Sequence, residues 1–133
     1  MRGSRISSGS HFEELAGYAR AVVDGEWVMV SGTTGFDYAT GAISDDVGAQ
    51  TEQCFRNIAA ALDQAGCTLA DLLRIRIYLA DAADFDVVAP IVGRHCRAAR
   101  PANTTLVAGM VDPRMRVEIE VTARRNPPAG DIL

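Results

Sequence analysis

The sequence lacks long hydrophobic runs and basic clusters. Its longest apolar runs fall far short of the roughly 20 residues that a membrane span needs, and its first ten residues lack the apolar segment of a signal peptide. The formal net charge is −4, aromatic residues make up 6%, and no basic cluster exceeds the pair Arg124-Arg125. Proteins that bind phosphate backbones need a basic face. We therefore expect neither a membrane nor a nucleic acid as partner.

Cysteine and histidine are also scarce. The three cysteines, Cys54, Cys67 and Cys96, are odd in number and show no CxxC spacing, and His11 and His95 are the only histidines. This pattern favours reduced thiols in a cytoplasmic protein over a disulfide framework or a zinc site. We expect no metal and no cofactor.

The remaining composition predicts one folded domain over residues 1–133. The chain is 48% hydrophobic and 23% charged, which is typical of a globular protein with a single core. The clearest local pattern lies near the C-terminus, where Val117, Ile119, Val121 and Ala123 alternate with polar residues. Such alternation predicts a strand with one buried face.

The rest of the chain predicts an α+β fold in which strands outnumber two main helices. A hairpin turn is expected at Asp24-Gly25, and Pro90 is expected to kink or restart the second helix. Arg100-Pro101 predicts an extended entry into a final pair of strands. The expected strands are 5–8, 18–23, 26–31, 72–79 and the two of segment 101–125; a loop is expected over 32–43, a turn of helix over 12–15, and helices over 47–65 and 81–96.

Because both main helices separate strands, the sheet should be mixed in direction, with the helices on one face. The opposite face would carry five polar side chains: Arg74, Arg76, Tyr78, Glu118 and Glu120. One explanation is self-association, which would enclose these groups in clefts between subunits. The alternative is an ordinary solvated sheet face.

Seven segments, in this order and spacing, resemble the RidA (YjgF/YER057c/UK114) family across nearly the whole chain. They are GYARAV (17–22), VSGTTG (30–35), DYATGAI (37–43), QTEQCFRNIAAAL (50–62), RIRIYLAD (74–81), RPANTT (100–105) and VEIEVTA (117–123).

The resemblance implies a chorismate-mutase-like fold and a homotrimer with three clefts between subunits. For the deaminase branch it implies hydrolysis of small reactive enamines and imines, such as 2-aminoacrylate, without metal or organic cofactor. By the same resemblance Glu118 corresponds to the residue that activates water, Tyr18 lines the cleft, and the backbone of Ser31 and Gly32 contacts the ligand. Thr105 stands where some members have cysteine.

The chain departs from the family pattern at Asn103. The deaminase branch has an arginine there that holds the substrate carboxylate, and asparagine offers a neutral donor in place of a charged, bidentate one. Ala89 likewise replaces a frequent asparagine. We hypothesise that Arg76 or Arg20 faces the cleft instead and binds an anionic ligand or Glu118; a surface or intersubunit ion pair is the alternative for each.

Three functions follow from these patterns. The first is a RidA-like hydrolase, a candidate enamine or imine deaminase with Glu118 as catalytic residue and Tyr18, Ser31, Gly32, Asn103, Thr105 and Arg76 binding a small molecule. The second is a non-catalytic trimer that binds or senses a small molecule. The third, an endoribonuclease or translation inhibitor, is disfavoured by the acidic balance and the lack of paired histidines.

Overall fold

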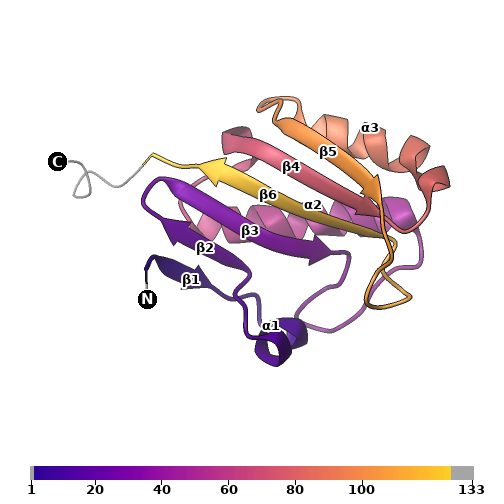
Figure 1. Ribbon diagram of the computed structural model, residues 1–133, viewed down its shortest axis with the longest axis horizontal. Coiled ribbons are helices and arrows are strands. Elements are labelled where there is room, and N and C mark those ends of the chain that lie inside the picture. Colours follow the sequence, from indigo (N-terminus) through magenta and orange to yellow (C-terminus); the bar gives the residue numbers. More distant parts are fainter. Residues whose placement is uncertain (1, 127–133) are drawn as a thin grey trace.

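The computed structural model describes residues 2–126, which form one mixed six-stranded sheet with helices on one side (Figure 1). The expected domain of residues 1–133 therefore includes positions, 1 and 127–133, that lie outside the described residues. The strand order is β1-β2-β3-β6-β4-β5. The strands are β1 (Ser4–Ile6), β2 (Ala21–Asp24), β3 (Trp27–Thr34), β4 (Leu72–Leu79), β5 (Ala102–Val107) and β6 (Val117–Arg124). The helices are α1 (His11–Ala16), α2 (Val47–Gln64) and α3 (Phe85–Cys96), with short 3₁₀ turns at Leu69–Asp71 and Ala82–Asp84.

Side-chain caps mark several helix starts. The Ser10 hydroxyl accepts from the Phe12 N–H before α1, and the Asp46 carboxylate accepts from the Ala49 N–H before α2. Thr68 and Asp71 form a reciprocal capping box around the first 3₁₀ turn. These caps satisfy N–H groups that lack partners in the first turn of a helix.

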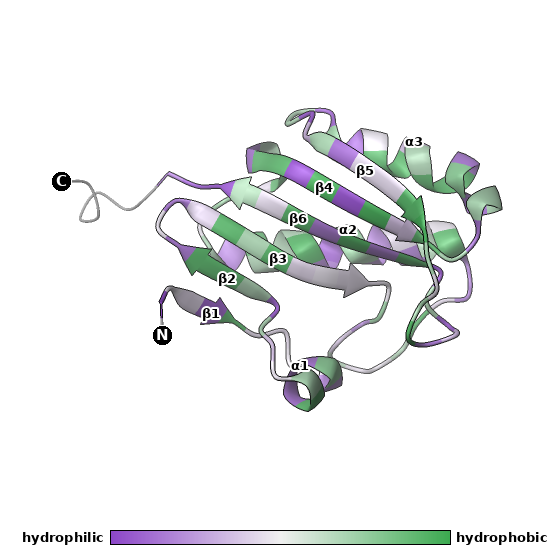
Figure 2. Cartoon of the chain, in the orientation of Figure 1, coloured by the Kyte–Doolittle hydropathy of each residue, from purple (hydrophilic) through white to green (hydrophobic). Residues whose placement is uncertain are grey.

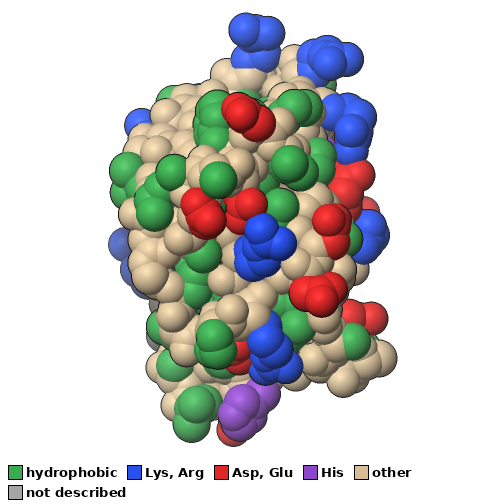
Figure 3. Space-filling model, turned by 90° about the vertical axis from the view of Figure 1, so that its right-hand side faces the viewer, with side chains coloured by type: hydrophobic (Ala, Val, Ile, Leu, Met, Phe, Trp, Pro, Cys, Tyr) green, Lys and Arg blue, Asp and Glu red, His purple; other side chains and the backbone are tan. Residues whose placement is uncertain are grey.

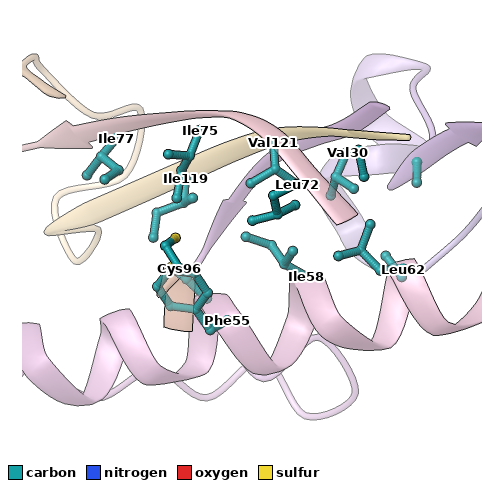
Figure 4. Packing of buried hydrophobic residues seen from close by; sticks show 14 of the residues in the cluster. Val30, Phe55, Ile58, Leu62, Leu72, Ile75, Ile77, Cys96, Ile119 and Val121 are labelled. Atoms are coloured by element: carbon teal, nitrogen blue, oxygen red, sulfur yellow. The ribbon is translucent and has the colours of Figure 1, made fainter. Parts of the chain in front are cut away.

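The core lies between the sheet and the two long helices. Figure 4 shows Phe55, Ile58 and Leu62 on α2 pointing towards the aliphatic side chains of the sheet. Ile75 and Ile119 are fully buried beneath these helices, as the alternation predicts. This layer fixes which face of each strand remains uncovered.

The opposite face of the sheet is polar along β4 and β6, as expected. Arg74, Arg76 and Tyr78 on β4 pair with Thr122, Glu120 and Glu118 on β6, and all six remain at least partly exposed. Figure 2 shows hydrophilic and hydrophobic residues following one another along β4 and β6. We call this uncovered side of the sheet the open face. No helix among the described residues is long and apolar enough to cross a membrane.

Several local expectations were wrong. The last two strands do not pair, because β4 lies between β5 and β6 and is parallel to β5. Arg100 is not extended but has a φ of 49°, in the left-handed region. α3 does not restart at Pro90 but runs through it as one helix, and a kink there stays a prediction. Residues 32–34 belong to β3 and not to the expected loop.

Candidate functional site

A β-bulge lies at the centre of the open face. Val30 pairs with Val121 and Thr33 pairs with Ile119, so Ser31 and Gly32 together stand opposite the single residue Glu120. A bulge of this kind bends its strand and redirects nearby groups, and bulges are frequent beside active sites. The sequence predicted contacts at Ser31 and Gly32 but gave no sign of the bulge.

Gly32 makes room for the Glu118 carboxylate. A Cβ atom at position 32 would overlap Glu118 Oε1. Both residues line a hollow of about 300 Å³, together with Tyr78, Glu120 and the backbone segment 108–110. Absence of a side chain at position 32 is therefore what allows the carboxylate to lie against the bulge.

The two glutamates of β6 have different environments. Glu120 accepts a hydrogen bond from the Tyr78 hydroxyl and lies 3.8 Å from Arg76. Among residues 2–126, by contrast, no side chain or backbone group donates a hydrogen bond to Glu118. Partial burial raises the pKa of Glu118, Arg20 opposes that shift, and the charge of Glu120 adds to it. A partly buried carboxylate with a raised pKa is typical of sites for acid–base chemistry.

Tyr18 and Ser31 line a second hollow beside the first. This hollow, of about 870 Å³, extends from Ser31 past Tyr18 to α1 and β1. The Tyr18 ring is 39% exposed, and partial burial raises the pKa of its hydroxyl. Ser31 and Gly32 are neighbours in the bulge, so the two hollows are lined by adjacent residues of β3.

Asn103 and Thr105 lie on the other side of the sheet. They pair with Ile75 and Ile77, whose side chains face the helices. Both line a groove of about 600 Å³ between β5 and α3, whose other walls are largely apolar. The Thr105 hydroxyl donates to Asn103 Oδ1 at 2.8 Å, which leaves the Asn103 amide as a hydrogen-bond donor.

The two predicted arginines lie in different environments. The Arg76 side chain is 48% exposed on the open face and lies beside Glu120, outside the Glu118 hollow. Arg20 is only 2% exposed, forms an ion pair with the buried Glu13, and lines a different hollow of about 300 Å³. A contact of either arginine with a ligand stays a prediction.

One chain therefore does not assemble the predicted site. It brings Glu118, Gly32, Ser31 and Tyr18 along the open face, whereas Asn103 and Thr105 lie in the groove by α3. Within residues 2–126, no group of three or more His, Cys, Asp or Glu side chains could hold a metal ion.

Sequence reasoning missed several residues of these surfaces. Arg97 and Arg100 line the groove next to Asn103, and neither forms an ion pair within the described chain. Tyr78 was placed on the polar face by alternation, but its hydrogen bond to Glu120 depends on the register of β4 and β6. Strand register was not available from the alternation alone.

Comparison with known proteins identifies the class to which this fold belongs. The family described as Endoribonuclease L-PSP matches residues 9–125. A crystal structure from Mycobacterium tuberculosis, described as a member of the highly conserved YjgF/YER057c/UK114 family, superposes with a TM-score of 0.83 at 39% identity, covering 91% of this chain and 98% of that one.

Two protein relatives extend the comparison. An uncharacterised protein of Streptomyces coelicolor is 36% identical over 91% of both chains. The human 2-iminobutanoate/2-iminopropanoate deaminase is 28% identical over 83% of this chain and 81% of its own. The chain belongs to the YjgF/YER057c/UK114 (RidA) family, with the α+β fold of that family.

Proposed function

We propose that this protein hydrolyses a small, reactive enamine or imine, with Glu118 as the base that activates water. The observation that carries the proposal is the half-buried Glu118 carboxylate, which lines a hollow and has no hydrogen-bond partner within residues 2–126. The name of the human relative, which specifies an imine deaminase, supports the same reaction class.

The chemistry requires a group that takes a proton and returns it. Glu118 removes a proton from water as the water oxygen bonds to the imine carbon, and the electron pair of the C=N π bond moves to nitrogen, which takes up this proton from Glu118. Glu118 then accepts the hydroxyl proton of the carbinolamine and passes it to nitrogen. The C–N bond breaks, ammonia leaves as the C=O bond forms, and Glu118 is again a carboxylate. A raised pKa suits this role, because the carboxylate is then a stronger base.

We propose further that the complete site lies between subunits of a homotrimer. Glu118 and Asn103 belong to surfaces on opposite sides of the same sheet, so a second copy must bring its β5–α3 groove to the open face of the first. In that arrangement Tyr18, Ser31, Gly32 and Glu118 come from one subunit, and Asn103 and Thr105 from its neighbour.

The groove suggests which imines fit. Its walls include Val88, Val92 and Ile77, and Asn103 presents an uncharged amide. An imine with an apolar side chain therefore fits these walls, with a polar group of the substrate accepting a hydrogen bond from the Asn103 amide.

Activity on 2-aminoacrylate and larger imines is the direct test. The imine is generated in situ by a dehydratase or an amino-acid oxidase, and release of the carbonyl product is followed with and without the protein. Glu118→Gln is the control that keeps shape and removes the base. Acceleration that is lost in Glu118→Gln supports the proposal, whereas equal rates with parent and variant for every imine refute it.

A non-catalytic binding protein is the second candidate. The neutral Asn103, oriented by Thr105, favours it because the chain has lost a charged contact to carboxylates. Such a protein would bind the carbonyl products in calorimetry and accelerate none of the hydrolyses.

An endoribonuclease activity has little structural support despite the description of the family. His95 stacks on Phe55 and pairs with Glu52, whereas His11 contacts Phe12 on α1, so no described contact joins the two histidines. On the face shown in Figure 3, acidic side chains lie among the basic ones. Binding of the protein to single-stranded RNA at low salt would support this function.

A further inference from the structure

Arg20 is a buried cation in a protein whose other arginines lie near the surface or in exposed ion pairs. Its side chain is 2% exposed, and its partner Glu13 is 6% exposed. The guanidinium carbon lies 4.6 Å from the centre of the Tyr38 ring and 5.8 Å from that of Tyr18. Such a position removes water from the charge and makes each remaining contact important.

Arg20 holds the bulge that supports Glu118. Its Nη1 donates to the Gly32 carbonyl at 2.7 Å and to Thr33 Oγ1 at 3.1 Å. The backbone of Arg20 and Ala19 also binds Ser31, through Ser31 N–H to Arg20 O at 2.9 Å and Ser31 Oγ to Ala19 O at 2.7 Å. The bulge is thus fixed to the segment that enters β2 by side-chain and backbone hydrogen bonds.

Stability alone does not explain this arrangement. Arg20 Nε is buried without a hydrogen-bond partner among the described residues, which is unfavourable for a charged group. Replacement of a buried ion pair by well-packed apolar residues often leaves stability unchanged or raises it. A buried pair with an unsatisfied donor therefore invites a functional explanation.

We propose that Arg20 is a positioning residue for the proposed reaction: it fixes the Gly32 carbonyl, and with it the bulge against which the Glu118 carboxylate lies. Glu13 sets the net charge below the bulge by pairing with Arg20. This role rests on the proposed function of Glu118. The Glu13–Arg20 pair, which lies below the bulge, then governs the catalytic base.

The electrostatic environment of Glu118 agrees with this role. Arg20 lowers the pKa of Glu118 against the effect of burial. The other groups near Glu118 are Glu120 on its own strand, Tyr78 and Arg76 on β4, and the Cys54 thiol on α2, whose own pKa is raised by burial and by Glu118. Arg20 is therefore the cation that acts directly on Glu118, since Arg76 lies beside Glu120.

The test uses opposite changes to the two members of the pair. Arg20→Gln removes the cation, so the pKa of Glu118 should rise by about one pH unit. Glu13→Gln leaves Arg20 unneutralised, so the pKa of Glu118 should fall. Both are measured by NMR titration of the labelled Glu118 carboxyl carbon, assigned by its loss in Glu118→Gln. Arg56→Gln, which removes an exposed arginine on α2, is the charge-matched control and should leave the titration unchanged.

The acid limb of the pH–rate profile should follow these titrations, moving to higher pH in Arg20→Gln and to lower pH in Glu13→Gln. Arg20→Lys keeps the charge but not the planar guanidinium that binds Gly32 and Thr33 through Nη1 and Glu13 through Nη2. It should restore the pKa of Glu118 while kcat remains lowered. If Arg20→Gln fails to fold, the pKa of Glu118 in Glu13→Gln and the kcat of Arg20→Lys still test the inference.

Shifts of the same sign in both variants, or no shift in folded protein, would overturn the inference. The NMR titration needs no turnover and thus separates this inference from the proposed function. Opposite shifts in a protein that hydrolyses no imine would leave Arg20 controlling Glu118 while refuting the deaminase proposal.

Discussion

The two faces of β6 carry alternate residues of the same strand and show how differently the two sides of this sheet are used. Val117, Ile119 and Val121 are packed beneath α2 and are almost completely buried. Glu118 and Glu120, between them, lie on a face that no helix covers. The covered face provides folding free energy, and the open face carries the carboxylate of the proposed site. The predictions below alter one face at a time.

The largest effect on stability is expected on the covered face. Ile119→Ala removes a fully buried side chain at the centre of the core and should lower the free energy of unfolding by about 2–5 kcal/mol, because the cavity it leaves cannot fully close. Urea denaturation checks the value. A loss below about 1 kcal/mol would show that the helix-covered core is less tightly packed than the structure indicates.

Glu118→Gln, in contrast to Ile119→Ala, should cause a large loss of activity and little loss of stability. Removal of the base should lower kcat by a factor of about 100 or more. The folded-state pKa of Glu118 is raised, so its contribution to stability is present below the unfolded pKa and is lost as pH rises through the folded pKa. In denaturation at several pH values, the parent should therefore lose stability relative to Glu118→Gln over that interval. A constant difference between the two proteins would contradict the raised pKa.

Asn103→Arg should sharpen substrate choice in the groove. A charged fork at position 103 should improve kcat/KM for carboxylate-bearing imines by roughly tenfold or more, since charge-assisted bidentate bonds are about twice as strong as neutral ones. The measurement compares 2-aminoacrylate with an uncharged imine in parent and variant, and Asn103→Gln is the neutral control. If the preference between the two imines is unchanged, the side chain at position 103 does not contact the substrate.

Arg76→Ala should have the smallest effect on stability. The partly exposed pair with Glu120 is 3.8 Å long and solvent-screened, so its loss should change the free energy of unfolding by less than about 1 kcal/mol. The direct contact of Arg76 with a ligand stays a prediction, and several-fold weaker product binding by calorimetry would support it. Unchanged binding would leave Arg76 with only its contact to Glu120.

The sequence predicted most of the covered face and only part of the open one. Strict alternation at Val117, Ile119 and Val121 and the helical spacing around Phe55 determine which side chains are buried, and the structure agrees. The family resemblance also identified the fold. Local pattern carries this information because burial by the helices repeats with the period of each element.

Other features depended on contacts between distant segments. Strand order placed β4 between β5 and β6, and no local pattern encodes that choice. The bulge at Ser31 and Gly32 and the burial of Arg20 arise from register and from the ion pair with Glu13. Asn103 lies on the helix side of an edge strand, so its relation to Glu118 involves a second copy of the chain in the proposed trimer.

The central proposal, a site shared between subunits, is tested most directly by coexpressing two inactive variants under different tags. Glu118→Gln removes the base. Gly93→Phe fills the β5–α3 groove, because Gly93 lines that groove and a Cβ atom added at position 93 would meet no other atom within 4 Å. If each site takes Glu118 from one subunit and the groove from the next, every mixed trimer has one intact site of three. Doubly tagged trimers should therefore recover about a third of the parent activity, and the whole randomly assembled population about a quarter. Mixed assemblies that remain as inactive as the separate variants would contradict the account.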